Sequence, residues 1–108
     1  MYDKKKQLTR HKTANPKKMP QTEYRLYVDF VNEKSSGVCQ CGCGRPAQDI
    51  HHAYFGAGGR DDRYIVAICR ECHYAIHHGT NIDEASALKL LCKSIGKDNW
   101  KEYTNEYA

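Results

Sequence analysis

Apolar side chains recur at spacings of three and four residues between positions 21 and 34. The residues concerned are Tyr24, Leu26, Tyr27, Phe30 and Val31. This period predicts an amphipathic helix, with Thr22 near its cap and the Ser-Ser-Gly segment 35–37 at its end. Every second residue from 24 to 30 is also apolar, so a strand is the alternative for this segment.

The middle of the chain has the patterns of two strands and a loop. Residues 63–68 (Arg-Tyr-Ile-Val-Ala-Ile) form a short run rich in apolar and β-branched side chains, which is the strongest strand signal in the chain. Residues 47–53 are mixed and predict a second short strand. Residues 55–62 contain three glycines and are expected to form a loop.

The C-terminal part predicts three helices. Residues 69–79 indicate a tight turn that leads into a short helix ended by Gly79. Asn81 is a suitable cap for a second helix through Ile95, and Gly96 is expected to close it. The apolar stripe of that helix consists of Ile82, Ala85, Leu88, Leu91, Cys92 and Ile95. Aromatic residues near the C-terminus predict a last short helix that packs back on the body: Trp100, Tyr103 and Tyr107.

Length and charge predict a single domain preceded by a basic arm. With 108 residues it is expected to form one domain. Residues 1–19 have no apolar period and are interpreted as a flexible basic arm, while residues 20–108 form the domain itself. Residues 1–25 hold eight Lys and Arg against two acidic residues, a net charge of +6, whereas the whole chain has +4. This basic segment predicts a polyanionic partner.

The six cysteines are interpreted as metal ligands and core residues. No stretch resembles a signal peptide or is long enough to span a bilayer, so we expect a cytoplasmic protein with no membrane partner. Thiols stay reduced there, and clustered cysteines then indicate a metal site rather than disulfides. Cys69 and Cys72 have the Cys-x-x-Cys spacing of a structural zinc site.

The second pair of zinc ligands must come from three closely spaced cysteines: Cys39, Cys41 and Cys43. Cys43 is expected in the pair, and Cys39 is favoured over Cys41 because three intervening residues are more usual than one. Cys92 lies on the apolar stripe of a predicted helix and is expected to belong to the core.

The histidines indicate a second metal site. His73 follows Cys72 directly, and His77 lies one helical turn later, so the two imidazoles share one face of a helix. Such a pair is a chelating arrangement. His51 and His52 are adjacent and lie between the two cysteine groups. His78 points away from the shared face.

Taken together, the order of these motifs resembles a known family. Cys-Gly-Arg-Pro-Ala, then Asp-Ile-His-His, a glycine-rich loop, and Ile-Cys-Arg-Glu-Cys-His-Tyr-Ala-Ile-His are similar to the HNH, or ββα-metal, endonucleases, above all to small phage and prophage members with cysteine knuckles. The resemblance covers roughly residues 38–79. It implies a small ββα-metal core with a structural zinc knuckle, flanked by an N-terminal helix and C-terminal helices.

The resemblance also implies residue roles. His51 would be the first ligand of one catalytic divalent ion and His52 the general base. His73 would be a second ligand, and His77, which matches an additional helix histidine of the family, would be the third. The middle Asn of the family would fall near Tyr64, where this chain has none, so Asp61 or Asp62 is expected to brace the loop instead.

The function implied is hydrolysis of phosphodiester bonds in DNA, with RNA as the alternative substrate, by an enzyme encoded by a phage or prophage and acting in the bacterial cytoplasm. Histidine ligands favour Zn, Ni, Co or Mn over Mg as the catalytic ion. Residues expected to contact nucleic acid are Arg60, Arg63, Lys4, Lys5, Lys6, Lys17 and Lys18. The alternative is a non-catalytic zinc module that binds nucleic acid, which would have no use for a base beside a metal ligand.

Overall fold

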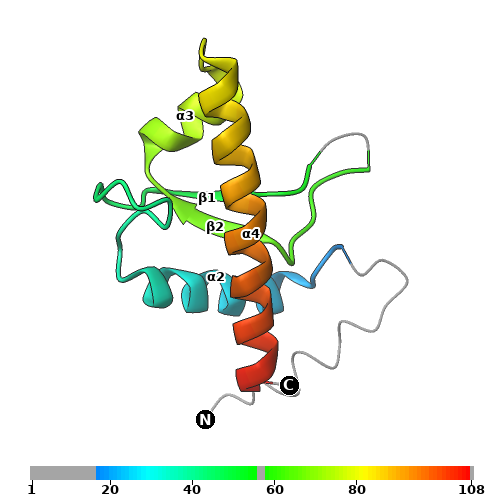
Figure 1. The fold of residues 1–108 in the computed structure, drawn as a ribbon. Helices are drawn as coiled ribbons and strands as arrows, with labels where there is room; N and C mark the ends of the chain where they lie inside the picture. The colour runs from blue at the N-terminus through cyan, green and yellow to red at the C-terminus, as the bar shows by residue number, and fades with distance from the viewer. Residues whose placement is uncertain (1–16, 56–57, 108) are drawn as a thin grey trace.

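A two-stranded antiparallel sheet and three helices make up the described part of the chain. The computed structural model describes residues 17–55 and 58–107. The elements are α2 (Gln21–Ser35), β1 (Asp49–His52), β2 (Ile65–Ile68), α3 (Arg70–His78) and α4 (Ile82–Tyr107). Figure 1 shows α4 as a long rod that crosses the sheet, with α3 beside its first turns and α2 toward its other end. The predicted α+β class is confirmed.

The sheet separates two parts of the core. All four residues of β2 are buried, and because successive side chains on a strand point to opposite faces, its apolar run serves both parts. Val66 and Ile68 pack with α3 and the buried cysteines. Ile65 and Ala67 pack with α2 and the end of α4. Both strands lie within the segments predicted for them.

The segment after Pro20 is a helix and not a strand. Tyr27 and Val31, four residues apart, are fully buried against β2 and α4, as the amphipathic period predicts. Thr22 lies near the cap, as predicted, but Pro20 is the N-cap residue and no side chain caps the helix. Ser36, in the left-handed conformation with φ of 56°, ends it.

The C-terminal helices predicted on either side of Gly96 are one continuous helix, so that prediction is wrong. Asn81 does cap it, since its side-chain oxygen accepts a hydrogen bond from the Glu84 backbone N–H at 3.0 Å. Gly96 is buried within α4, and a Cβ built there would lie 3.1 Å from the carbonyl carbon of Tyr64. Glycine is therefore present to let α4 approach the chain before β2, and not to stop the helix.

The buried face of α4 also differs from the predicted stripe. Ile82 is 78% exposed and Leu91 is 40% exposed. Cys92 is fully buried, as expected, and the buried face continues through Gly96 to Asn99 and Tyr103. The Asn99 amide bonds to the Ile65 carbonyl at 2.8 Å and to the Gln40 side chain at 2.9 Å. A buried polar residue thus fixes α4 on β2, which a search for apolar residues does not detect.

Candidate functional site

Four cysteines converge beside α3: Cys39, Cys43, Cys69 and Cys72. Their sulfur atoms all lie within 4.8 Å of one another, and the Cys39–Cys72, Cys43–Cys72 and Cys43–Cys69 separations are 3.9, 3.9 and 3.5 Å. Four sulfurs at about 2.3 Å from a tetrahedral zinc ion would be about 3.8 Å apart. The cluster is therefore compatible with a structural zinc site.

Cys39, and not Cys41, belongs to the cluster, in agreement with the favoured pairing. The Cys41 sulfur lies instead 3.9 Å from the sulfur of Cys92, beneath α4. Glycines at 42 and 44, with φ of 87° and 80°, turn the chain back so that Cys43 faces Cys69. Burial raises the pKa of Cys39 to about 11, and a bound cation would favour the thiolate form of this ligand.

Three histidines form a second cluster next to the first. His51 of β1 and His73 and His77 of α3 bring their nitrogen atoms within 4.8 Å of one another. The ring centroids are 5.0 to 5.3 Å apart. Burial, then the neighbouring His73 and His77, lower the pKa of His51 to about 4, which keeps this imidazole neutral.

A divalent cation fits these three residues. Nε2 of His51 is buried and has no hydrogen-bond partner among the described residues. A buried polar nitrogen without a partner is costly, and a neutral imidazole is the form that binds metals. The donor set also fits such a cation, because three nitrogen ligands leave further coordination positions open for water or substrate.

Asp49 supports this cluster through His73, a role that the sequence analysis did not predict. One carboxylate oxygen of Asp49 accepts a hydrogen bond from Nδ1 of His73 at 3.0 Å, which directs Nε2 of His73 toward the other histidines. The bond to His73, with a smaller effect from Arg70, lowers the pKa of Asp49. Asp49 is two residues before His51 on one strand, so both side chains lie on the same face of the sheet. The spacing of two residues on a predicted strand is the sequence signal that could have indicated this role.

His52 lies apart from the cluster, on the opposite face of the sheet. It pairs with Ile65, and its ring stacks on Tyr24 of α2 with a centroid distance of 5.9 Å. Its Nε2 is 3.0 Å from Oδ1 of Asp62. Burial lowers the pKa of His52, although the Asp62 carboxylate acts in the opposite direction.

The two aspartates named for the bracing role have different partners. Asp61 accepts hydrogen bonds from Nε and Nη2 of Arg63, at 3.0 and 2.9 Å, and from the Arg63 backbone N–H. Asp62 holds His52 and also accepts a bond from the backbone N–H of Met19 at 3.1 Å. Asp62 is therefore the residue that positions His52.

The basic residues expected at nucleic acid are spread around this region. Arg60 is exposed, whereas the guanidinium of Arg63 is held by Asp61. Lys17 and Lys18 are exposed, but Met19 is buried and the Lys17 carbonyl accepts a bond from the Asp62 backbone N–H at 2.9 Å. The end of the predicted arm thus lies against the loop. The remaining positions, Lys4, Lys5 and Lys6, lie outside the described residues.

Comparison with known proteins identifies no relative, so the site is interpreted from its own geometry. No family model, no curated protein and no solved structure matches the chain. None of the helices in the described part combines the length and apolar character that a membrane span requires.

Proposed function

We propose that this protein is a metal-dependent endonuclease of the HNH type, in which β1, β2 and α3 are the ββα core. The observation that carries the proposal is the division of two adjacent histidines between the faces of one sheet. His51 lies with His73 and His77, and His52 lies with Asp62 and Tyr24. One imidazole is thus available to a metal ion, and its neighbour is held by a carboxylate away from that ion.

In the proposed reaction, His52 accepts a proton from the attacking water. A carboxylate can only accept hydrogen bonds, so the contact with Asp62 places the ring proton on Nε2 and leaves the lone pair on Nδ1. Nδ1 is therefore the atom that takes the proton. A divalent ion held by His51, His73 and His77 would stabilise the charge of the phosphate and of the leaving 3′-oxygen.

The cysteine cluster has a structural role in this proposal. Cys69 caps α3, since its sulfur accepts a hydrogen bond from the Cys72 backbone N–H at 3.3 Å. Zinc bound by Cys39, Cys43, Cys69 and Cys72 would fix the start of the helix that carries His73 and His77. The nuclease site would then depend on the zinc site for its geometry but not for its chemistry.

The substrate in this proposal is a nucleic acid, with DNA tested first, because basic residues around the site would attract the phosphodiesters. Arg60, Lys17 and Lys18 are exposed near the loop that holds His52. Purified protein is incubated with supercoiled plasmid and a panel of Mg, Mn, Co, Ni and Zn ions, with a chelator as the negative control. A parallel incubation with RNA of the same sequence identifies which polymer is cut.

The roles of the histidines can be separated by three substitutions. His52→Ala should keep both metal sites and lose cleavage by about 100- to 10,000-fold, the usual contribution of a general base. His51→Ala should weaken binding of the catalytic ion, and a higher metal concentration should partly restore the rate. His78→Ala is the matched control, because His78 is an exposed neighbour of His77 outside the cluster, and it should cut normally.

Cleavage rate and metal content are measured together for each variant. A His52→Ala protein that cuts at the wild-type rate would contradict the mechanism. If His52→Ala loses its metal while His51→Ala keeps it, the two roles are reversed. Failure of the wild-type protein to cut DNA or RNA with any ion would favour the non-catalytic zinc module.

A further inference from the structure

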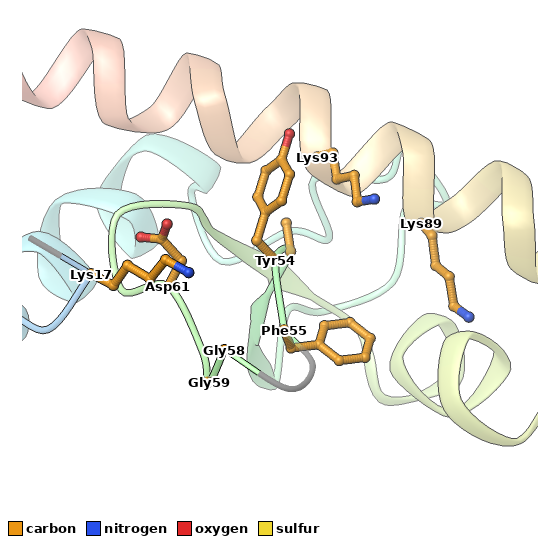
Figure 2. Close-up of a pocket in the computed structure, with 9 residues that line it drawn as sticks. Lys17, Tyr54, Phe55, Gly58, Gly59, Asp61, Lys89 and Lys93 are labelled. Carbon is orange, nitrogen blue, oxygen red and sulfur yellow. The ribbon is translucent and has the colours of Figure 1, made fainter.

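A pocket of about 380 Å³ lies between α4 and the loop that follows β1. Figure 2 shows Lys89 and Lys93 extending from α4 toward this loop, with Phe55 beneath them and Lys17 on the far side. The described lining residues are Lys17, Ala53, Tyr54, Phe55, Gly58, Gly59, Asp61, Lys89 and Lys93. The proposed mechanism uses none of these lysines on α4.

The lysines of the pocket belong to a regular row. Lys89, Lys93, Lys97 and Lys101 are spaced four residues apart on α4, a rise of about 6 Å per step. Acidic residues 98, 102 and 106 form a separate row. Lys93 and Glu102 are nine residues, or about two and a half turns, apart and so lie on opposite sides of the helix. From residue 89 onward the positive and negative charges of α4 therefore lie on different sides of the helix, and Lys89 and Lys93 line the pocket.

The aromatic and acidic groups of the pocket do not neutralise the charge of Lys89 and Lys93. The ammonium of Lys93 lies 5.2 Å from the ring centroid of Tyr54, which holds it at the wall. Asp61 brings a carboxylate to the pocket, but it is 5% exposed and is paired with the guanidinium of Arg63. The pocket is therefore lined by lysine ammonium groups, and its one described carboxylate, that of Asp61, is already paired with Arg63.

Phe55 connects the pocket to the histidine cluster. Its ring centroid is 5.3 Å from that of His77 and 5.8 Å from that of His51. The residue is nevertheless 46% exposed. A large exposed aromatic ring between a metal-binding cluster and a lysine-lined pocket is a surface on which a base can stack.

We propose that this pocket binds one unpaired nucleotide of the substrate strand, with its phosphate on Lys89 and Lys93 and its base against Phe55. The inference rests on the proposed nuclease function and adds a preference for single-stranded or unpaired substrate. The volume exceeds what a phosphate alone would fill. The ring of Phe55 can meet the face of a base only where that base is not stacked within a duplex.

Binding is tested by fluorescence anisotropy with a labelled single-stranded oligodeoxynucleotide and the full chain carrying His52→Ala, which should slow cleavage by about 100- to 10,000-fold. Lys89→Gln with Lys93→Gln should weaken binding, and the slope of log K against log salt should flatten by about 0.7 for each lost contact. The matched control is Arg25→Gln with Lys101→Gln, which removes the same charge at two exposed positions outside the pocket lining. Equal losses from both pairs would overturn the pocket in favour of diffuse attraction.

The base contact is tested at Phe55. Phe55→Leu keeps an apolar side chain and removes the aromatic face, so single-strand affinity should fall by about 5- to 150-fold, whereas Phe55→Trp should retain it. Metal content is measured for both variants, because Phe55 contacts two histidines of the cluster. Full affinity in Phe55→Leu would overturn the stacking contact.

A fully paired duplex of the same sequence serves as the competing probe. We expect it to bind more weakly than the single strand and to be insensitive to Phe55→Leu. Duplex binding that equals single-strand binding, with the same dependence on Lys89 and Lys93, would overturn the proposal. Anisotropy does not depend on cleavage, so the two proposals can fail separately. If the protein cuts plasmid but fails the binding tests, the pocket proposal alone is disproved. If it passes the binding tests but does not cut, the nuclease proposal alone is disproved.

Discussion

His51 and His52 acquire different surroundings from the simplest property of a strand. His51 pairs with Val66 and lies on the face of the sheet that α3 covers. His52 pairs with Ile65 and lies on the face that α2 covers. The sequence allowed this division to be expected, because adjacent strand residues point to opposite sides. It did not reveal Tyr24, whose ring reaches His52 from 28 residues earlier.

Asp49 should control the affinity of the histidine cluster for its ion. Its carboxylate holds Nδ1 of His73, and loss of such an outer contact typically weakens metal binding by about 10- to 100-fold. We therefore expect Asp49→Ala to bind Mn²⁺ or Co²⁺ more weakly by that factor in calorimetric titrations of zinc-loaded protein.

The control for Asp49 is Asp29→Ala, which removes an exposed carboxylate from α2 and should leave the titration unchanged. Zinc content is measured in both variants, since the cysteine cluster should keep its ion. Wild-type affinity in Asp49→Ala would show that the packing of α3 alone orients His73.

Among the elements, α4 depends most on a single close contact. Gly96→Ala would place a methyl group 3.1 to 3.3 Å from three atoms of Tyr64. Tyr64 cannot retreat easily, because its carbonyl accepts a bond from the Ala53 backbone N–H at 2.8 Å. Overpacking costs about 1–3 kcal/mol, which exceeds the gain of about 1 kcal/mol in helix propensity. We expect the free energy of unfolding to fall by about 1 kcal/mol in urea titrations.

Ser94→Ala provides the matched comparison for Gly96→Ala. Ser94 is exposed on the same helix, so this change tests helix propensity without a packing effect and should stabilise slightly. A Gly96→Ala protein that is as stable as Ser94→Ala would mean that α4 can move away from Tyr64 at little cost.

The elements that were predicted correctly are those whose signals are local. The period of α2, the apolar run of β2 and the turn before α3 are each contained within a few residues. The break predicted at Gly96 was wrong because glycine serves there in a contact with Tyr64, 32 positions earlier. The bond from Met19 to Asp62 likewise joins residues 43 positions apart, which no local pattern reports.

At the scale of the molecule, the cysteine cluster and the histidine cluster share one supporting structure. Cys69 and Cys72 begin α3, and His73 and His77 follow on it. Four cysteines also belong to the core on this side of the sheet: Cys39, Cys69, Cys72 and Cys92. A chain of 108 residues has a modest core, so loss of the ion that joins these sulfurs should affect the whole domain and not one loop.

Removal of the structural metal is therefore expected to unfold the protein. Zinc bound by small cysteine sites contributes about 10–16 kcal/mol to folding, comparable with the whole stability of about 5–15 kcal/mol of a domain. Cys72→Ala should lose zinc and its cooperative thermal transition in circular dichroism, whereas Cys41→Ala, beside the cluster but outside it, should keep both. A Cys72→Ala protein that is metal-free and still unfolds cooperatively would show that packing around β2 and α4 holds the domain without zinc. In that case α3 would remain ordered by its contacts with α4, and the histidine cluster would have to bind its ion independently of the cysteines.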